Sequence, residues 1–296
     1  MAQTDDIPIV AVDGGGTSCR FALLHAGRRH EAKLGGANVM TDCDRAIRTI
    51  RDGISGLAAE AGLGETGLAR AVAYLGLAGV RSEDLARRVA GALAVGKVLV
   101  EDDRPSTVVA AFGSGDGTVA GIGTGSFVAR QREGAISALG GWGFHLGDEA
   151  SGAWLGRLAL ARCLHAIDGI CAPSPLTDSL LAEFGDRPDR MMEFARDARP
   201  AEFGRFAPRV IEAAAAGDAN GRVLMQRGAD YIMDAARALG WQPGEALCLA
   251  GGIGPHYREY LPAEAAGAVT APRGSTLDGA LELAGRLAAG ALEPMR

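Results

Sequence analysis

Lysine is nearly absent from this chain of 296 residues, which contains only Lys33 and Lys97. The Walker P-loop requires a lysine directly after its last glycine, and neither lysine stands in that position. The V-A-I-K and H-R-D motifs of protein kinases are missing as well. A nucleotide site in this chain must therefore be built in a different way.

Paired cysteines and long apolar runs are also lacking. The five cysteines are scattered and form no C-x-x-C motif, so neither a disulfide framework nor a structural zinc site is expected. No apolar run reaches the roughly 18 residues that a membrane span needs. The residues before Ile7 are acidic and polar, unlike a signal peptide. We expect a cytoplasmic protein without a membrane partner.

The charge and the length further limit the classes of protein and the number of domains that fit this chain. The formal net charge is -6 at pH 7, which disfavours a nucleic-acid partner, and 22% charged residues is ordinary for a globular chain. Hydrophobic residues make up 48% of the sequence. Since a single core rarely grows beyond about 250–300 residues, we expect two domains.

The first part of the chain alternates strand and helix patterns. Helical spacing of apolar residues occurs at 47–61 and 82–93. Short apolar runs typical of strands lie at residues 7–12, 21–24, 31–34, 71–75 and 98–100. This alternation predicts an α/β domain over residues 1–112.

The opening pattern recurs after the glycine-rich stretch at 113–117. A strand at 119–122 again leads through a glycine turn into a return strand, which indicates an internal duplication. The second α/β domain is expected over 113–296, with a mostly helical insertion at 149–240. The final helix, expected at 275–290, either stays in that domain or packs back on the first.

Glycine turns that follow strands are suited to phosphate binding, because a backbone without Cβ atoms lets N–H groups approach phosphate oxygens. The candidates are Gly14, Gly15, Gly16 and Thr17 in the first turn, Gly123, Thr124, Gly125 and Ser126 in the second, and Gly251 and Gly252 after the last core strand. One such turn also fits an ordinary hairpin, but three favour a nucleotide site. A dinucleotide fold is disfavoured because its glycine turn opens a helix.

Carboxylates stand next to these turns. Asp13 ends the first strand, where it can hold Mg²⁺ close to nucleotide phosphates, although a turn-forming role also fits. Asp103 ends another strand, where it can accept the proton of an attacking hydroxyl. It can equally cap the helix that Pro105 begins, and Asp102 is its nearest rival as the base.

The loop at 140–149 combines glycines, aromatic residues and an acidic end. Trp142 or Phe144 can pack on a sugar ring, and Asp148 or Glu149 can accept hydroxyl or ammonium hydrogens. Glu149 also suits the N-terminus of the next helix. His145 is expected to be a solvated or hydrogen-bonded loop residue.

Four segments together resemble the BadF-type ATPase family, which includes N-acetylglucosamine kinases and bacterial glucosamine kinases. They are residues 13–20, 123–126, 140–151 and 249–253, they occur in the family's order, and the likeness covers nearly the whole chain. The family belongs to the superfamily of actin, hexokinase and heat-shock chaperone ATPases. The resemblance therefore implies two ribonuclease-H-like, actin-like ATPase domains with a nucleotide cleft between them.

The resemblance also implies roles for single residues. Thr17 and Thr124 fall in the two phosphate loops, and Gly251 and Gly252 belong to the adenosine motif. Asp103 falls where the family places its catalytic base. The positions that align with sugar contacts are Asn38, Asp103 and Asp148.

Two departures bear on the acceptor sugar. N-acetylglucosamine kinases often carry Asn where this chain has Phe127, which favours a free amine. The segment 141–143 differs from the corresponding loop of the glucosamine kinases, which points the other way. Residues 36–40, 168–170, 173–178 and 203–208 are similar to glucosamine kinases.

The expected activity is ATP- and Mg²⁺-dependent phosphorylation of the 6-hydroxyl of an amino sugar, with glucosamine preferred and N-acetylglucosamine as the alternative. A BadF-type ATPase activator or regulator without kinase activity is a further alternative. An activator needs cysteines placed for an iron–sulfur cluster, and Cys163 and Cys171 lack the compact spacing expected for one. Family members often dimerise, so the resemblance also implies a homodimer.

Overall fold

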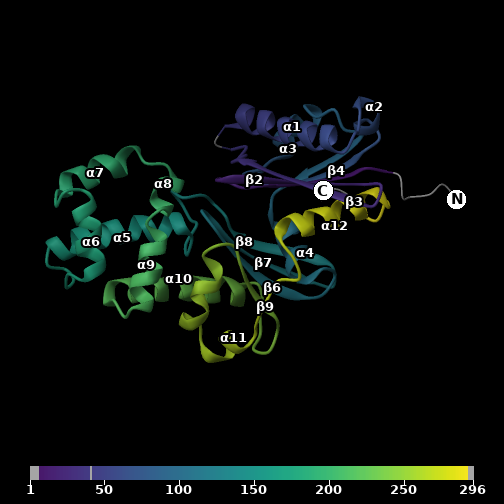
Figure 1. Ribbon diagram of the computed structural model, residues 1–296. Helices are drawn as coiled ribbons and strands as arrows, with labels where there is room; N and C mark the ends of the chain where they lie inside the picture. The colour runs from purple at the N-terminus through teal and green to yellow at the C-terminus, as the bar shows by residue number, and fades with distance from the viewer. Residues whose placement is uncertain (1–6, 41, 293–296) are drawn as a thin grey trace. The chain divides into compact units, whose positions relative to one another are not determined.

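The computed structural model describes residues 7–40 and 42–292, which form two compact units (Figure 1). The first unit holds the described residues up to Ser114 and those from Pro272 onward, and the second is Gly115–Ala271. The chain first crosses from the first unit to the second after Ser114, two residues beyond the boundary expected at residue 112. The segment from Pro272 onward, which contains the expected final helix, belongs to the first unit by its contacts, and this is one of the two placements that the sequence left open.

The first unit is built on a mixed five-stranded sheet. Its strands are β1 (Ile9–Gly14), β2 (Ser18–His25), β3 (Arg28–Gly35), β4 (Val72–Leu77) and β5 (Lys97–Glu101). The spatial order is β3-β2-β1-β4-β5, with β1 antiparallel to β2 and parallel to β4. Every residue of β4 is buried, as expected for a parallel strand covered on both faces.

Helices cover both faces of this sheet (Figure 1). They are α1 (Cys43–Glu60), α2 (Glu65–Leu68), α3 (Glu83–Gly91), α4 (Arg104–Phe112) and α12 (Thr276–Ala288). Because successive strand residues point to opposite faces, Val10 and Val12 pack with α1, while Ala11 packs with α12. Asp42 caps α1 by accepting from the Arg45 amide. Thr41, whose capping-box spacing with Asp44 also predicts a helix start here, lies outside the described residues.

The second unit repeats the same sheet. Its strands are β6 (Gly117–Ile122), β7 (Ser126–Arg132), β8 (Ala135–Gly140), β9 (Leu247–Ala250) and β10 (Val269–Thr270). The order is β10-β9-β6-β7-β8, and β6 is antiparallel to β7 and parallel to β9. Order and directions match those of the first unit, so the predicted fold class, two α/β domains of one design, is confirmed.

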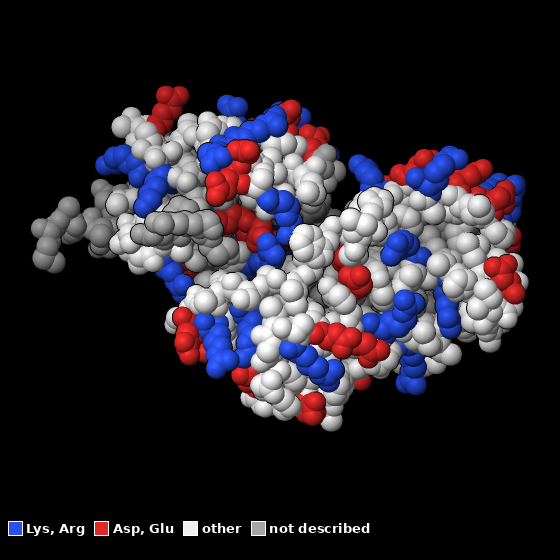
Figure 2. Space-filling model, turned by 180° about the vertical axis from the view of Figure 1, so that it is seen from behind, with Lys and Arg blue, Asp and Glu red and all other residues white. Residues whose placement is uncertain are grey.

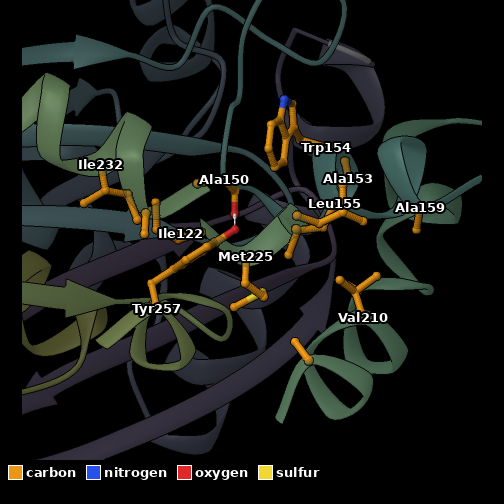
Figure 3. Close-up of a cluster of buried hydrophobic side chains, with 14 of the residues drawn as sticks. Ile122, Ala150, Ala153, Trp154, Leu155, Ala159, Val210, Met225, Ile232 and Tyr257 are labelled. Carbon is orange, nitrogen blue, oxygen red and sulfur yellow. Dashed lines mark hydrogen bonds between the residues drawn. The ribbon is translucent and has the colours of Figure 1, made fainter. Parts of the chain in front are cut away.

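A group of helices completes the second unit, and some of them contact its sheet. It comprises α5 (Gly152–Ile167), α6 (Pro175–Glu183), α7 (Pro188–Asp197), α8 (Pro200–Gly204), α9 (Ala207–Ala215), α10 (Ala219–Ala238), the 3-10 helix η2 (Gly254–Tyr260) and α11 (Ala263–Gly267). Figure 3 shows part of the shared core, in which Ile122 of β6 belongs to one hydrophobic cluster with side chains of α5, α9, α10 and η2. This core fixes the positions of the loops at the ends of β6 and β9.

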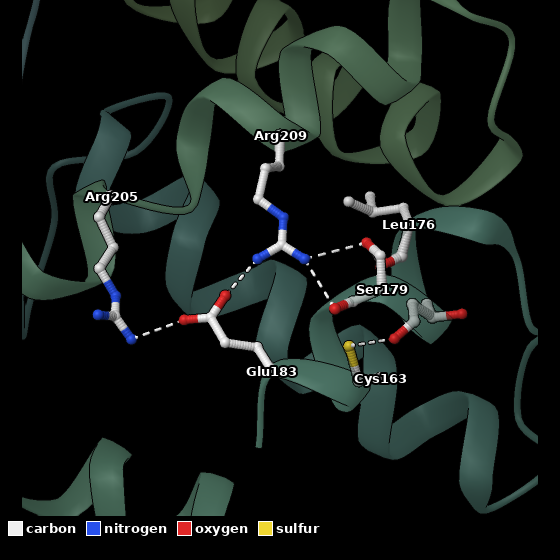
Figure 4. Close-up of polar contacts among 7 residues, drawn as sticks. Cys163, Leu176, Ser179, Glu183, Arg205 and Arg209 are labelled. Atoms are coloured by element: carbon white, nitrogen blue, oxygen red, sulfur yellow. Dashed lines mark hydrogen bonds and ion pairs between the residues drawn. The ribbon is translucent and has the colours of Figure 1, made fainter. Parts of the chain in front are cut away.

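An ion-pair network ties α6 to α9 and to the residue that follows α8 (Figure 4). Glu183 of α6 accepts from Arg205 at 2.9 Å and from Arg209 of α9, and Arg209 also donates to the Ser179 carbonyl at 2.7 Å. On the face shown in Figure 2, acidic and basic side chains are interspersed. Among the described helices, none is both long and apolar enough to cross a membrane.

Candidate active site

In the first unit, Asp13 and the first glycine turn lie at the carboxyl end of β1. The turn closes through a hydrogen bond from the Gly15 amide to the Ser18 carbonyl at 2.9 Å, and Gly16 and Thr17 are exposed. The Ala37 amide donates to the Gly15 carbonyl at 3.0 Å, which brings the segment with Asn38 against the turn. Asn38 is therefore brought close to Asp13 and the turn, although it is distant from both in sequence.

The Asp13 carboxylate is largely buried and faces a cation. Arg20, its cross-strand partner on β2, places Nη1 3.8 Å from Oδ2 of Asp13. Burial raises the pKa of Asp13, and the charge of Arg20 partly opposes this rise. Among the described residues no three acidic, histidine or cysteine side chains gather as a metal cage. Asp13 thus suits Mg²⁺ that takes most of its ligands from phosphates and water.

Asp102 and Asp103 have different surroundings at the start of α4. Asp102 accepts from the Arg104 amide at 2.9 Å and from Arg104 Nε at 2.7 Å. Asp103 occupies the N-cap position, but its side chain makes no capping hydrogen bond. Its backbone carbonyl accepts from the Ser106 and Thr107 hydroxyls at 3.1 and 2.8 Å. The capping role that the sequence left open falls to Asp102.

The Asp103 carboxyl therefore has the properties of a proton acceptor. Burial raises its pKa to about 6, and the charges of Asp102 and Asp13 add to the shift. A general base works best when its pKa lies near the operating pH. At neutral pH this group is ionised yet retains appreciable proton affinity.

In the second unit, the second glycine turn is held against the start of α5. The Gly123 amide donates to the Gly125 carbonyl at 2.9 Å, and the Gly152 amide donates to the Gly123 carbonyl at 2.8 Å. Thr124 is half-buried, whereas the Ser126 hydroxyl is buried and donates to the Glu149 carbonyl at 2.5 Å. Of the two predicted hydroxyls, Ser126 supports the neighbouring loop and Thr124 stays accessible.

The loop between β8 and α5 separates the two candidate aromatic side chains. Trp142 is 75% exposed, whereas Phe144 is buried, with its ring centroid 5.0 Å from that of Phe203. His145 is exposed and packs edge-on against Phe144. Trp142 is therefore the aromatic group that can meet a ligand, and Phe144 belongs to the core.

The acidic end of this loop is buried and strained. Asp148 is 9% exposed, accepts from the Gly143 amide at 3.3 Å and lies against Gly125 of the second turn. Both Asp148 (φ 58°) and Ala150 (φ 67°) adopt left-handed backbone conformations. The N-cap of α5 is Ser151, which accepts from the Trp154 amide at 3.1 Å, so Glu149 is not the cap.

The third glycine turn, which contains Gly251 and Gly252, follows β9. A Cβ at Gly251 (φ 81°) would lie 2.2 Å from the Ile122 carbonyl oxygen, so only glycine fits there. The Ile253 amide donates to the same carbonyl at 3.1 Å. Gly251 and Gly252 are exposed at the ends of β6 and β9, close to the second turn in the same unit.

Two tyrosines near these loops were missed at the sequence level. The Tyr231 hydroxyl of α10 would lie 2.7 Å from a Cβ at Gly140, and burial with the charges of Glu149 and Asp148 raises the pKa of Tyr231. Tyr257 of η2 donates to the Ala150 carbonyl at 2.7 Å. Both contact the loop from about 80 to 110 residues away, so no local pattern could have signalled them.

Comparison with known proteins gives relatives along almost the full chain. Glucosamine kinase GspK of Vibrio cholerae is 28% identical over 280 residues, which cover 94% of this chain and 95% of that protein. A solved structure from Chromobacterium violaceum, described as a candidate N-acetylglucosamine kinase, is 31% identical with a TM-score of 0.86 and covers 95% of this chain and 99% of its own.

A more distant structure shares the fold alone. The ROK family glucokinase from Streptomyces griseus, solved with glucose and AMPPNP, is 18% identical with a TM-score of 0.58, over 96% of this chain and 99% of that one. The model of the BadF/BadG/BcrA/BcrD ATPase family matches residues 10–280, from the first strand to the last helix. The chain belongs to the BadF/BadG/BcrA/BcrD ATPase family.

Proposed function

We propose that this protein transfers the γ-phosphoryl group of ATP to the 6-hydroxyl of an amino sugar, with glucosamine as the preferred acceptor. The observation that carries the proposal is the environment of Asp103. Its carboxyl lies at the carboxyl end of β5, is released from helix capping by Asp102, and has a pKa of about 6. Family membership and the glucosamine kinase relative point to the same chemistry.

In the proposed reaction, Asp103 accepts the proton of the attacking hydroxyl. The sugar oxygen forms its bond to the γ-phosphorus as the bond to the ADP oxygen breaks, in line. The protonated Asp103 then returns its proton to solvent. Because phosphoryl transfer depends mainly on positioning and charge stabilisation, one base and well-placed phosphate donors are sufficient protein chemistry.

Asp13 is the proposed holder of Mg²⁺. Bound Mg²⁺ supplies positive charge against the developing charge on the phosphates. Asp13 directly precedes the first glycine turn in sequence, and the Arg20 guanidinium on the next strand lies 3.8 Å from its carboxylate. The Gly15 and Gly123 amides are used within their own turns, so the proposed phosphate donors are the amides of Gly16, Thr124 and Gly125. Thr17 and Thr124 are the proposed hydroxyl donors.

Asn38, Trp142 and Asp148 are the proposed sugar contacts. Trp142 offers an exposed face for a sugar ring, and the buried Asp148 carboxylate suits an ammonium group. The ring of Phe127 packs against Gly121 on the sheet, so this position offers no polar group for an acetamido oxygen. That arrangement favours an acceptor sugar with a free amine over an N-acetylated one. The Chromobacterium relative keeps N-acetylglucosamine as the second candidate acceptor.

An iron–sulfur activator is the less favoured alternative. Cys163 is buried, its Sγ donates to the Ala159 carbonyl at 3.3 Å, and burial raises its pKa to about 12. Such a thiol is a poor cluster ligand, since ligation needs the thiolate. We place the proposed reaction in the cytoplasm, where ATP is available, and we expect a homodimer from the family resemblance.

The test is a coupled ADP-release assay with Mg²⁺-ATP and a panel of glucosamine, N-acetylglucosamine, N-acetylmannosamine and glucose. Turnover that is highest with glucosamine supports the full proposal. Turnover only with acetylated sugars retains the mechanism and rejects the free-amine assignment. ADP release that is independent of every sugar rejects the kinase proposal in favour of an activator or regulator.

A further inference from the structure

The segment 148–151 is held in an unfavourable backbone conformation. Asp148 and Ala150 both have positive φ, although neither is glycine. Left-handed conformations cost non-glycine residues free energy and persist only when the surroundings enforce them. The structure must therefore contain contacts that impose this shape on the proposed sugar-binding loop.

Some of these contacts come from the second phosphate turn. Ser126 donates to the Glu149 carbonyl at 2.5 Å, and the Gly152 amide donates to the Gly123 carbonyl at 2.8 Å. These bonds hold the residues on either side of Ala150. The carbonyl of Ala150 itself accepts a hydrogen bond from a side chain in the core of the second unit.

There the Ala150 carbonyl meets Tyr257 (Figure 3). The Tyr257 hydroxyl donates to it at 2.7 Å, and the whole tyrosine side chain is buried. The ring has little room to move, because its hydroxyl would lie 2.4 Å from a Cβ at Gly228 of α10. A buried carbonyl that lost this donor would be left without its partner, so the peptide would turn to find another.

Tyr257 also lies close to the proposed adenosine motif, Gly251 and Gly252. It lies in η2, the helix that follows the exposed Gly251 and Gly252. The Ile253 amide fastens the start of this helix to the end of β6. One rigid core side chain therefore connects the helix after the proposed adenosine motif with the loop that presents Asp148.

We propose that Tyr257 is a positioning residue: its hydroxyl holds the Ala150 carbonyl and so keeps the Asp148 carboxylate in the orientation that binds the amino sugar. The inference rests on the proposed function only for the identity of the ligand. Holding the loop is a property of the chain alone. Tyr257 touches neither the sugar nor the reacting atoms.

The test compares Tyr257→Phe with a matched control, Trp241→Phe. Trp241 lies in the same core and donates one hydrogen bond from Nε1 to the Glu245 carbonyl at 3.0 Å, away from the loop. Both variants should lower Tm by a few degrees. Only Tyr257→Phe should speed hydrogen exchange of the amides of residues 143–153, and equal exchange in both variants would overturn the proposal.

The substrate readout uses titration calorimetry with glucosamine and, separately, with ADP. Tyr257→Phe should raise the Kd for glucosamine about tenfold, as expected when one buried hydrogen bond that holds a binding group is lost. The Kd for ADP should change less than twofold, and the sugar KM should rise with little change in kcat. Unchanged sugar affinity, or an equal loss in Trp241→Phe, overturns the inference.

Gly228→Ala provides a second variant that keeps the hydroxyl but displaces the ring. It should raise the Kd for glucosamine in the same direction and loosen the same amides. If the wild-type protein binds no amino sugar while Tyr257→Phe still loosens the loop, the positioning role stands and the proposed function fails. If the wild-type protein binds glucosamine and neither variant changes the loop or the affinity, the inference alone fails.

Discussion

Asp102 and Arg104 form a closed pair at the start of α4, in which the Asp102 carboxylate accepts both the Arg104 amide, at 2.9 Å, and the Nε, at 2.7 Å. One carboxylate thereby caps the helix and neutralises the nearest cation. The adjacent Asp103 carboxyl is spared both tasks, and burial raises its pKa. This division of roles between two consecutive aspartates has direct consequences for activity and stability.

Asp103→Asn should abolish turnover while leaving ligand binding nearly intact. Loss of a general base typically costs about 10²–10⁴-fold in rate, whereas the amide keeps the shape and polarity of the side chain. The check is kcat from ADP release alongside the Kd values for ATP and glucosamine. Asp102→Asn is the control: asparagine caps a helix about as well as aspartate, so the variant should lose at most about 1 kcal/mol of stability, through the lost ion pair with Arg104, with a far smaller loss of kcat. A larger kcat loss in Asp102→Asn would reverse the assignment.

Asp103→Asn should also stabilise the folded protein at neutral pH. The folded protein retains the Asp103 proton up to about pH 6, whereas the unfolded chain releases it near the ordinary value of 3.8. The unfolded state binds fewer protons between these values, so the charge of Asp103 increasingly destabilises the fold as the pH rises through this window. Asp103→Asn should therefore raise the free energy of unfolding by about 1–3 kcal/mol at pH 7.5.

At pH 3.5 that difference should vanish, because Asp103 is then largely protonated in both states. Urea denaturation of both proteins at the two pH values measures the effect. A gain of equal size at both pH values would show that the buried charge is not its cause.

Alanine variants of Trp142 and Phe144 should have different effects, the first on sugar binding and the second on stability. Trp142 is 75% exposed, so Trp142→Ala should leave Tm nearly unchanged and raise the KM for the sugar several-fold through the loss of a stacking face. Phe144 is buried against Phe203, so Phe144→Ala should cost about 3 kcal/mol of stability. Thermal unfolding and sugar KM for both variants check the pair. A normal KM in Trp142→Ala would remove Trp142 from the site.

Two glycines of α12 should respond oppositely to alanine. A Cβ at Gly279 would lie 2.1 Å from the Ser106 carbonyl oxygen and 2.7 Å from the Ala110 amide nitrogen, both backbone atoms of α4. Gly279→Ala must therefore push the two helices apart, and it should lower Tm by several degrees. Gly285 has open space around its Cβ position, so Gly285→Ala should stabilise by up to about 1 kcal/mol. A neutral Gly279→Ala would contradict the close packing of α12 on α4.

The hairpins and the first strands were predictable because their signals are local. Apolar runs and glycine turns predicted β1, β6 and their return strands. The repeated pattern predicted an internal duplication, and the two sheets do share one strand order. Strand ends were less accurate. The third strand was expected at 31–34 but spans Arg28–Gly35, since a mostly exposed strand carries a weak apolar pattern.

The sequence named the residues of the proposed site but not the contacts that each of them makes. Sequence position alone could not distinguish Asp102 from Asp103, or Trp142 from Phe144, because each pair has similar chemistry within two residues. The side chains' surroundings make the distinction: Arg104 engages Asp102, and the aromatic core takes up Phe144.

The sequence by itself determined the local elements: which runs form strands, where glycine turns interrupt them, and which acidic residues stand at strand ends. These depend on neighbours a few residues apart. Only the tertiary structure decided that α12 completes the first unit and that Tyr257 holds the loop at Ala150. Such contacts depend on burial and on hydrogen bonds between residues about a hundred or more positions apart, and no short-range pattern in a single sequence encodes them.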